Sequence, residues 1–266
     1  MKRSYVWKIA LLAVALLGMS AAAQAVDRQG TYDKTFPLGA GGEVTVNNTN
    51  GTVEVEAWDR AEVRVQAVKK VRAGTADRAA EALDRMKVSV EASADRVAVR
   101  TAGDRDSGGF LSWLFGNHVE AGVSYTLSVP RGARVEVETV NGKVRIHGIA
   151  GAVDASTVNG SVELTDLRGG AKASTTNGGV RVDLAELPST AAVRLETTNG
   201  GIHLTVPRDA RLAIDASTVN GGIDISGLQA NVSHHSRRHV EATVNGGGGG
   251  EVRLSTVNGG IKISGE

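Results

Sequence analysis

Three histidines crowd into one short stretch near the carboxyl end of the chain. The segment 233–239 contains His234, His235 and His239. Three imidazoles within so few residues could coordinate zinc or copper, because histidine nitrogens are common ligands of both metals. The same segment carries two arginines, which would repel a cation, and no acidic residue. The local pattern therefore favours a solvated loop over a metal site, and we assign no metal ligand from it.

The sequence contains no motif for covalent or cofactor chemistry. It has no Gly-x-Ser-x-Gly nucleophile elbow and no cysteine, which excludes thiolate nucleophiles, thiolate metal sites and disulfides. The glycine run 246–250 precedes a strand-like sequence, so it indicates a flexible bulge and not a phosphate-binding loop. We therefore expect a protein that is not an enzyme and that binds no cofactor.

An unusual apolar segment lies within residues 104–119, between charged and glycine-rich flanks. Its large apolar side chains are Phe110, Leu111, Trp113, Leu114 and Phe115. The segment could fold back as a cap, because large exposed apolar patches are uncommon. It could also contact a partner or a membrane surface, where Trp and Phe serve as anchors. It is the candidate interaction loop of the chain.

The first 25 residues have the pattern of a secretory signal peptide. Three basic residues flank an apolar run at 9–17, and Ala23-Gln24-Ala25 fits the cleavage rule, which places the cut after Ala25. The run is too short for a spanning helix, and an uncleaved anchor is the alternative. Cleavage removes three of the 30 basic residues and none of the 29 acidic ones, leaving a net charge of about −2. A chain with this net charge lacks the excess of positive charge that is typical of nucleic-acid-binding proteins.

The main signal is an internal repeat built around Asn-Gly. The dipeptide begins at Asn50, Asn141, Asn159, Asn177, Asn199, Asn220, Asn245 and Asn258. Apolar residues alternate with polar ones on both sides, as in STVNGSVEL and STVNGGIKI, which predicts strand, corner, strand in each unit. Asn and Gly suit a tight corner because both tolerate positive φ. The Asn245 copy departs from the pattern, because glycines 247–250 follow it.

Two architectures satisfy this repeat, an antiparallel meander and a β-solenoid with parallel stacking of equivalent strands. The solenoid is favoured because aligned positions carry the same residue type. Stacking places Val on Val and Asn on Asn about 4.8 Å apart, and Asn ladders satisfy side-chain amides. The threonine two residues before the Asn lies in phase with the buried positions, which predicts an inward or corner role.

The amino-terminal part, residues 26–133, reads as further strands with one short helix at 75–87. Thr75 is a plausible N-cap, and Ala79, Ala82, Leu83 and Met86 form an apolar stripe at helical spacing. We expect this helix to pack over the sheet or to cover the open end of the repeat. Residues 134–266 form the repeat itself. Its last strand, 261–266, has no obvious cap, so it is predicted to be an open edge for self-association.

The array of Thr-Val-Asn-Gly units behind a signal peptide resembles a bacterial family of adhesin-like β-strand-repeat domains of unknown function. The resemblance also rests on NGTVEVEAWD at 50–59 and SYTLSVPRGARVEVETVNG at 124–142. It implies an exported β-repeat protein and brings no catalytic residues with it.

These observations together predict an all-β protein, a β-solenoid or parallel β-helix-like repeat with one short helix. The expected function is non-enzymatic and adhesin-like, in the periplasm or at the cell surface, or as a secreted protein, with an unknown envelope partner. The alternative is an envelope polysaccharide-binding or polysaccharide-cleaving solenoid, since such enzymes also use this scaffold.

Overall fold

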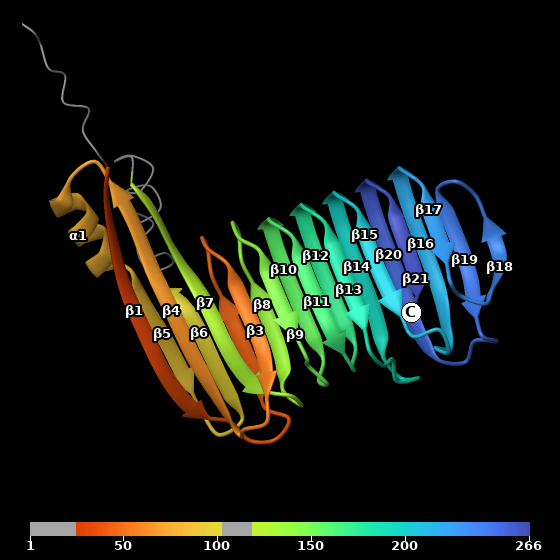
Figure 1. Ribbon diagram of the computed structural model, residues 1–266, viewed down its shortest axis with the longest axis horizontal. Coiled ribbons are helices and arrows are strands. Elements are labelled where there is room, and N and C mark those ends of the chain that lie inside the picture. Colours follow the sequence, from red (N-terminus) through yellow and green to blue (C-terminus); the bar gives the residue numbers. More distant parts are fainter. Residues whose placement is uncertain (1–24, 103–118) are drawn as a thin grey trace, which may run out of the picture.

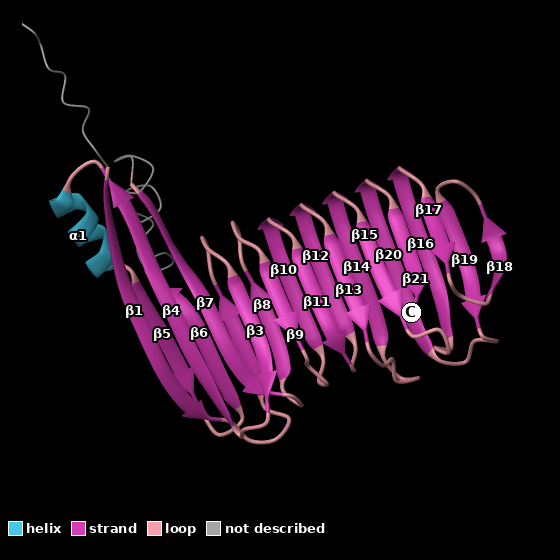
Figure 2. Cartoon of the chain, in the orientation of Figure 1, coloured by secondary structure: helices cyan, strands magenta, loops and turns pink. Residues whose placement is uncertain are grey.

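The computed structural model describes residues 25–102 and 119–266. Most of the predicted signal peptide and the whole set Phe110, Leu111, Trp113, Leu114 and Phe115 lie outside these ranges. Within them, the chain forms two long sheets that face each other, as Figures 1 and 2 show, with one helix at the amino-terminal end. No helix in the described part is both long enough and apolar enough to cross a membrane.

The described strands form a ten-stranded sheet A and an eleven-stranded sheet B. Sheet A contains, in spatial order, β1 (Val26–Pro37), β4 (Glu62–Ala73), β7 (Glu120–Pro130), β3 (Val53–Trp58), β9 (Val144–His147), β11 (Val162–Leu167), β13 (Val180–Leu184), β15 (Ile202–Val206), β21 (Ile261–Gly265) and β17 (Ile223–Ser226). Sheet B contains β18 (Ala230–His235), β19 (His239–Val244), β16 (Leu212–Asn220), β20 (Gly250–Asn258), β14 (Ala192–Asn199), β12 (Ala171–Asn177), β10 (Val153–Asn159), β8 (Arg134–Glu138), β2 (Glu43–Asn47), β6 (Arg96–Ala102) and β5 (Lys87–Ala92).

The repeat forms a parallel solenoid, which confirms the predicted fold class. Each coil places one strand in sheet B, turns at Asn-Gly and places the next strand in sheet A. Strand β10 pairs with β12 in parallel, with Thr157 opposite Thr175 and Asn159 opposite Asn177. The predicted asparagine ladder is also present, since the Asn159 amide donates to the side-chain oxygen of Asn141 at 2.8 Å. Equivalent residues therefore stack on one another. An antiparallel meander would not require this stacking.

Alternating side chains of both sheets fill one continuous core. Val, Ile, Leu and Ala point inward between the sheets and are buried along the whole length of the described chain. At the corners the repeated threonine is buried as well. In five coils its hydroxyl donates to a glycine carbonyl of a stacked coil, as Thr175 does to Gly160 at 2.9 Å, whereas the Thr139 hydroxyl has no partner in the described chain. The predicted corner role of threonine is thus confirmed, and its bond satisfies a polar group that burial would otherwise penalise.

The corner glycines serve a purpose in addition to the one expected. Among the described residues other than glycine, positive φ occurs at Asp166 and Asn245 and not at the ladder asparagines. Glycine is needed because the coils approach so closely. A Cβ added to Gly160 would lie 2.0 Å from the carbonyl oxygen of Gly142, and one on Gly200 would lie 1.9 Å from that of Gly178. Coil stacking therefore fixes glycine at these corners, and positive φ is an added requirement at the corner glycines Gly51, Gly178 and Gly246.

Helix α1 (Ala76–Arg85) lies against β1 and β4 at the amino-terminal end (Figure 1). Thr75 is its N-cap, as predicted, and its hydroxyl accepts a hydrogen bond from the Arg78 amide at 3.4 Å. Ala79 and Ala82 are buried on the face that meets the sheet. The helix thus shields the apolar end of the strand stack, beyond which the described residues form no further coil.

The carboxyl-terminal coil does not form the open edge that the sequence predicted. Strand β21 pairs with β15 on one side and with β17 on the other, and β20 lies between β14 and β16. The strand predicted at 261–266 is therefore interior. The chain runs outward through β16 and β17, forms the antiparallel hairpin β18–β19 beside β16, and returns to insert its last coil. The outermost strands at this end are β17 in sheet A and β18 in sheet B.

Candidate functional site

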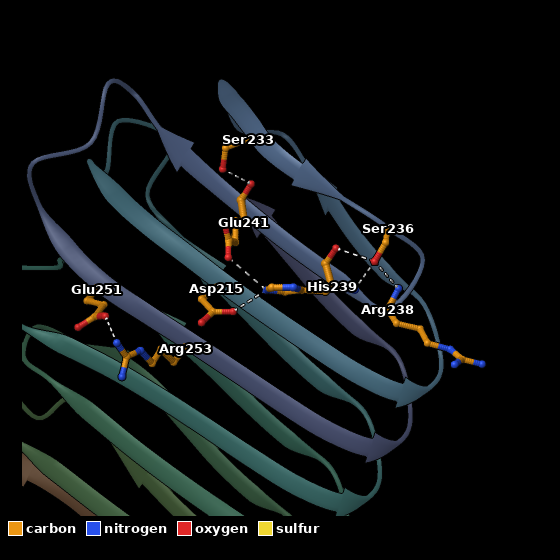
Figure 3. Close-up of polar contacts among 8 residues, drawn as sticks. All are labelled: Asp215, Ser233, Ser236, Arg238, His239, Glu241, Glu251 and Arg253. Carbon is orange, nitrogen blue, oxygen red and sulfur yellow. Dashed lines mark hydrogen bonds and ion pairs between the residues drawn. The ribbon is translucent and has the colours of Figure 1, made fainter.

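The histidine segment forms a β-hairpin and not the solvated loop that its sequence favoured. Figure 3 shows His239 on β19 directed at acidic side chains. Its Nε2 lies 3.1 Å from Asp215 Oδ1 on β16 and 3.6 Å from Glu241 Oε1. The ring of His234 lies 5.2 Å from that of His239. The acidic partner from β16 is distant in sequence, which is why the segment alone did not reveal it.

The arrangement around His239 does not amount to a metal centre. Among the described residues, no group of three or more His, Cys, Asp or Glu side chains is placed to hold a metal ion. Ser236 closes the hairpin instead, because its hydroxyl oxygen accepts the His239 amide at 2.9 Å and its hydroxyl lies 3.1 Å from the His239 carbonyl. The cluster therefore fastens β19 to its neighbours.

The outward face of sheet A carries a row of polar side chains, with one member from each coil at the first outward position after the Asn-Gly corner. In spatial order the row is Glu54, Arg145, Glu163, Arg181, His203, Lys262 and Asp224. Consecutive members lie on neighbouring parallel strands, about 4.8 Å apart. Their charges can therefore be compared directly along the solenoid axis.

The first half of this row is electrically balanced. Arg145 pairs with Glu54 and lies 3.8 Å from Glu163, and Lys143 Nζ lies 2.8 Å from Glu163 Oε2. The hydrogen bond from Lys143 holds the pKa of the Glu163 carboxyl below its usual value, with help from the charges of Lys143, Arg145 and Arg181. Alternating charges on adjacent strands stabilise such a face.

The second half of the row, Arg181, His203 and Lys262, is not balanced, and we call these three residues the basic row. All three side chains are exposed. No ion pair joins Arg181 or Lys262 to a carboxylate in the described part of the chain. Arg181 and Lys262 lie two strands apart, with His203 between them, so the face carries two cations about 10 Å apart. The basic row therefore departs from the charge pattern that the rest of the face follows.

Sheet B offers a direct comparison, since Lys172, Arg194 and Arg253 also stack there on adjacent strands. Each of these cations has an acidic partner. Lys172 lies 2.9 Å from Asp154, Arg194 lies 2.7 Å from Glu196, and Arg253 lies 2.6 Å from Glu251. The hydrogen bond with Asp154 raises the pKa of Lys172. Stacked cations are thus neutralised on sheet B and left without partners on sheet A.

A shallow depression lies beside the basic row. Its volume is about 370 Å³, and Gly179, Gly201, Arg181, His203 and Lys143 are among the residues that line it. The two glycines follow the corner Asn-Gly, and the coil of β21 adds Gly260 at the equivalent position. These positions carry Lys143 and Ser161 in the earlier coils. Loss of those side chains leaves the basic row open to solvent along one side.

The sequence contained a signal for this surface that position-by-position interpretation missed. The units that contain Asn-Gly-Gly begin at Asn177, Asn199, Asn220, Asn245 and Asn258, and the first, second and last of them supply the basic row. The repeat predicts which residue of each unit points outward. It does not predict which outward residues are neighbours, because that depends on which coils stack together.

The other candidate surface, the apolar loop of 104–119, stays a prediction, because Phe110, Leu111, Trp113, Leu114 and Phe115 lie outside the described residues.

Comparison with known proteins places the chain among β-repeat proteins. A sequence model described as Toastrack DUF4097 matches residues 42–264. No curated protein matches the sequence. Among solved structures, a candidate cell adhesion protein from Clostridium sporogenes is similar, with 10% identity and a TM-score of 0.48, over 89% of this chain and 100% of that one.

Two further solved structures are similar to this chain. A candidate adhesin from Bacteroides fragilis has 11% identity and a TM-score of 0.44, over 88% of this chain and 97% of that one. A candidate lipid-binding protein from Parabacteroides distasonis has 11% identity and a TM-score of 0.31, over 89% and 95%. At such identities no residue role can be carried over to this chain.

Proposed function

The chain belongs to the Toastrack DUF4097 family, and from this premise we propose that it is a non-enzymatic, adhesin-like interaction protein exported to the cell envelope. The proposal for export rests on the leader pattern of residues 1–25. The proposal for binding rests on one observation above all: Arg181 and Lys262 form no ion pair in the described chain, whereas Lys143 and Arg145 on the same face do. A rigid stack of coils can present such groups over a long surface, where weak contacts add together.

The state of Glu163 supports binding in preference to cleavage of a polymer. Glycoside hydrolysis needs one carboxylic acid that stays protonated near neutral pH, in addition to a carboxylate. Glu163 is the register partner of Arg181, and the Lys143 hydrogen bond lowers its pKa. It is therefore ionised at neutral pH and poorly suited to donate a proton.

Two experiments test the proposal. The first is fractionation of the cells, followed by protease treatment of intact cells. Recovery of the protein in the cytoplasm with its leader intact would contradict export, whereas loss to external protease would place it at the surface. Protection in the periplasm would exclude adhesion to other cells and leave an envelope partner.

The second experiment measures binding of labelled protein, residues 26–266, to isolated envelopes. The variant Arg181→Gln/Lys262→Gln removes two charges from sheet A, and Lys172→Gln/Arg253→Gln removes the same two charge types from sheet B. We expect the first variant to lose most of its binding and the second to retain it. Equal binding by both variants would exclude the basic row as the contact surface.

A further inference from the structure

We propose that the basic row binds an acidic polysaccharide that lies along the solenoid axis, a ligand class that deepens the proposed function and rests on it. The first argument is charge. Arg181 and Lys262 flank His203 on three consecutive strands and have no carboxylate partner in the described chain. Neither cation forms an ion pair among the described residues, so both are available to anionic groups of a ligand. Arg181 can hold a carboxylate or sulfate with two parallel hydrogen bonds, and Lys262 supplies a point charge.

The second argument is the chemistry on either side of the basic row. On one side Gly179, Gly201 and Gly260 leave space against the backbone. On the other side the next outward positions carry the hydroxyls of Thr205 and Ser264, which lie opposite each other, and Asp183 on β13. Hydroxyl groups both donate and accept hydrogen bonds, as sugar hydroxyls do. A polyhydroxylated chain with spaced acidic groups fits this combination of exposed glycine backbone, cations and hydroxyls.

The third argument concerns the length of the positive patch. Glu163 precedes it on β11, Asp224 follows it on β17, and Asp183 lies on the same face of β13. Three coils span about 10 Å at the ordinary strand spacing. Acids at both ends disfavour a polymer with a charge at every unit and favour one in which neutral sugars separate the acidic ones.

The same features argue against nucleic acid. Tight binding of a duplex typically neutralises about six to ten phosphates, more than the basic row offers. Binding of single strands relies on aromatic stacking, and aromatic residues make up 3% of this chain. The chain without its leader also carries a slight negative charge.

The test is titration of the protein, residues 26–266, with defined polymers at low salt. The probes are hyaluronan, in which carboxylated and neutral sugars alternate, dextran sulfate, uncharged dextran and duplex DNA. We expect hyaluronan to bind, with at least tenfold weaker binding to Arg181→Gln/Lys262→Gln and less than twofold change for Lys172→Gln/Arg253→Gln. Thermal unfolding of both variants should match that of the parent, because all four side chains are exposed.

Each outcome decides the ligand class. Binding of hyaluronan or dextran sulfate that depends on Arg181 and Lys262 supports the proposal and identifies the preferred acid as carboxylate or sulfate. Tightest binding to DNA, equal binding to dextran, or binding that ignores the two residues would overturn it. If envelopes bind through Arg181 and Lys262 but no acidic glycan does, the ligand class is wrong and the proposed function stands. If envelopes do not bind either, both fail.

Discussion

Thr218 on β16 donates its hydroxyl hydrogen bond to the carbonyl oxygen of Gly259 at 2.9 Å, although the two residues are 41 positions apart. In the earlier coils the same bond spans 15 to 19 positions. Thr256 in turn donates to Gly200, 56 positions earlier. The last coil therefore occupies the place that chain order would give to β16. It fits there because STVNGGIKI differs from STVNGGIDI at one position.

This coil order can be tested by an engineered disulfide, since the chain has no cysteine of its own. Ser217 and Ser255 are register partners on β16 and β20. Neighbouring strands place their Cα atoms within the range that a disulfide needs. We expect Ser217→Cys/Ser255→Cys to cross-link within one chain on oxidation, as measured by loss of free thiols and by peptide mapping.

The matched control for that cross-link is Glu196→Cys/Ser217→Cys. Glu196 on β14 is the register partner of Ser255, so β20 separates it from Ser217. We expect this pair to stay reduced within the folded monomer. An efficient cross-link here, with none in the first pair, would mean that β16 packs directly on β14.

The corner glycines give a second prediction. In Gly200→Ala the new Cβ would lie 1.9 Å from the carbonyl oxygen of Gly178, which forces the coils apart. Overpacking of this kind costs roughly 1–3 kcal/mol, and we expect about 3 kcal/mol in the free energy of unfolding by urea. Gly222→Ala is the control, because no atom lies within 4 Å of its added Cβ. Similar losses in both variants would refute the close-approach explanation.

The threonine column gives a third prediction, with a matched pair of isosteric changes. Thr175 donates to Gly160 at 2.9 Å, whereas the buried Thr139 hydroxyl has no hydrogen-bond partner among the described residues. Thr175→Val should lower the free energy of unfolding by about 1 kcal/mol, because the Gly160 carbonyl loses one hydrogen bond. Thr139→Val should be neutral or stabilising. The opposite ranking in urea unfolding would show that the corner bond does not stabilise the stack.

Tyr125 on β7 gives a prediction about alkaline pH. Burial raises the pKa of Tyr125 to about 12. The hydrogen bond with Thr101 lowers this pKa, but by less than burial raises it. A phenol whose folded pKa lies above its unfolded value stabilises the fold fully below pH 10, and this contribution is lost as pH rises towards 12. Two pKa units correspond to about 3 kcal/mol.

The measurement compares urea unfolding of the parent and Tyr125→Phe between pH 9 and 12. Tyr125→Phe should be less stable at pH 9 but should lose less stability as the pH rises. Tyr32→Phe is the comparison variant: burial also raises the pKa of this less buried phenol, and its charge adds to the raised pKa of Tyr125, so we expect a smaller effect in the same direction. A parallel loss in the parent and in Tyr125→Phe would mean that Tyr125 ionises as freely in the folded protein as in the unfolded one.

The repeat alone predicted much of this molecule. Strict alternation around Asn-Gly identified the buried positions, and Val162, Leu164, Val180 and Val182 are all buried. Identical residues at equivalent positions predicted parallel stacking and the asparagine ladder. The capping threonine and the apolar stripe predicted helix α1. These features depend on local backbone geometry and on periodic burial, both of which a single unit of sequence expresses.

Tertiary structure decided which coils are neighbours. Units of nearly the same sequence can pair with one another equally well, so sequence similarity does not specify their order. The hairpin β18–β19 occupies the free side of β16 and leaves the inner position to the last coil. That order places Lys262 next to His203, whose other neighbour is Arg181, and so creates the basic row. The charge pattern of the candidate site is therefore a property of the stacking, because it arises between residues that no local stretch of sequence contains together.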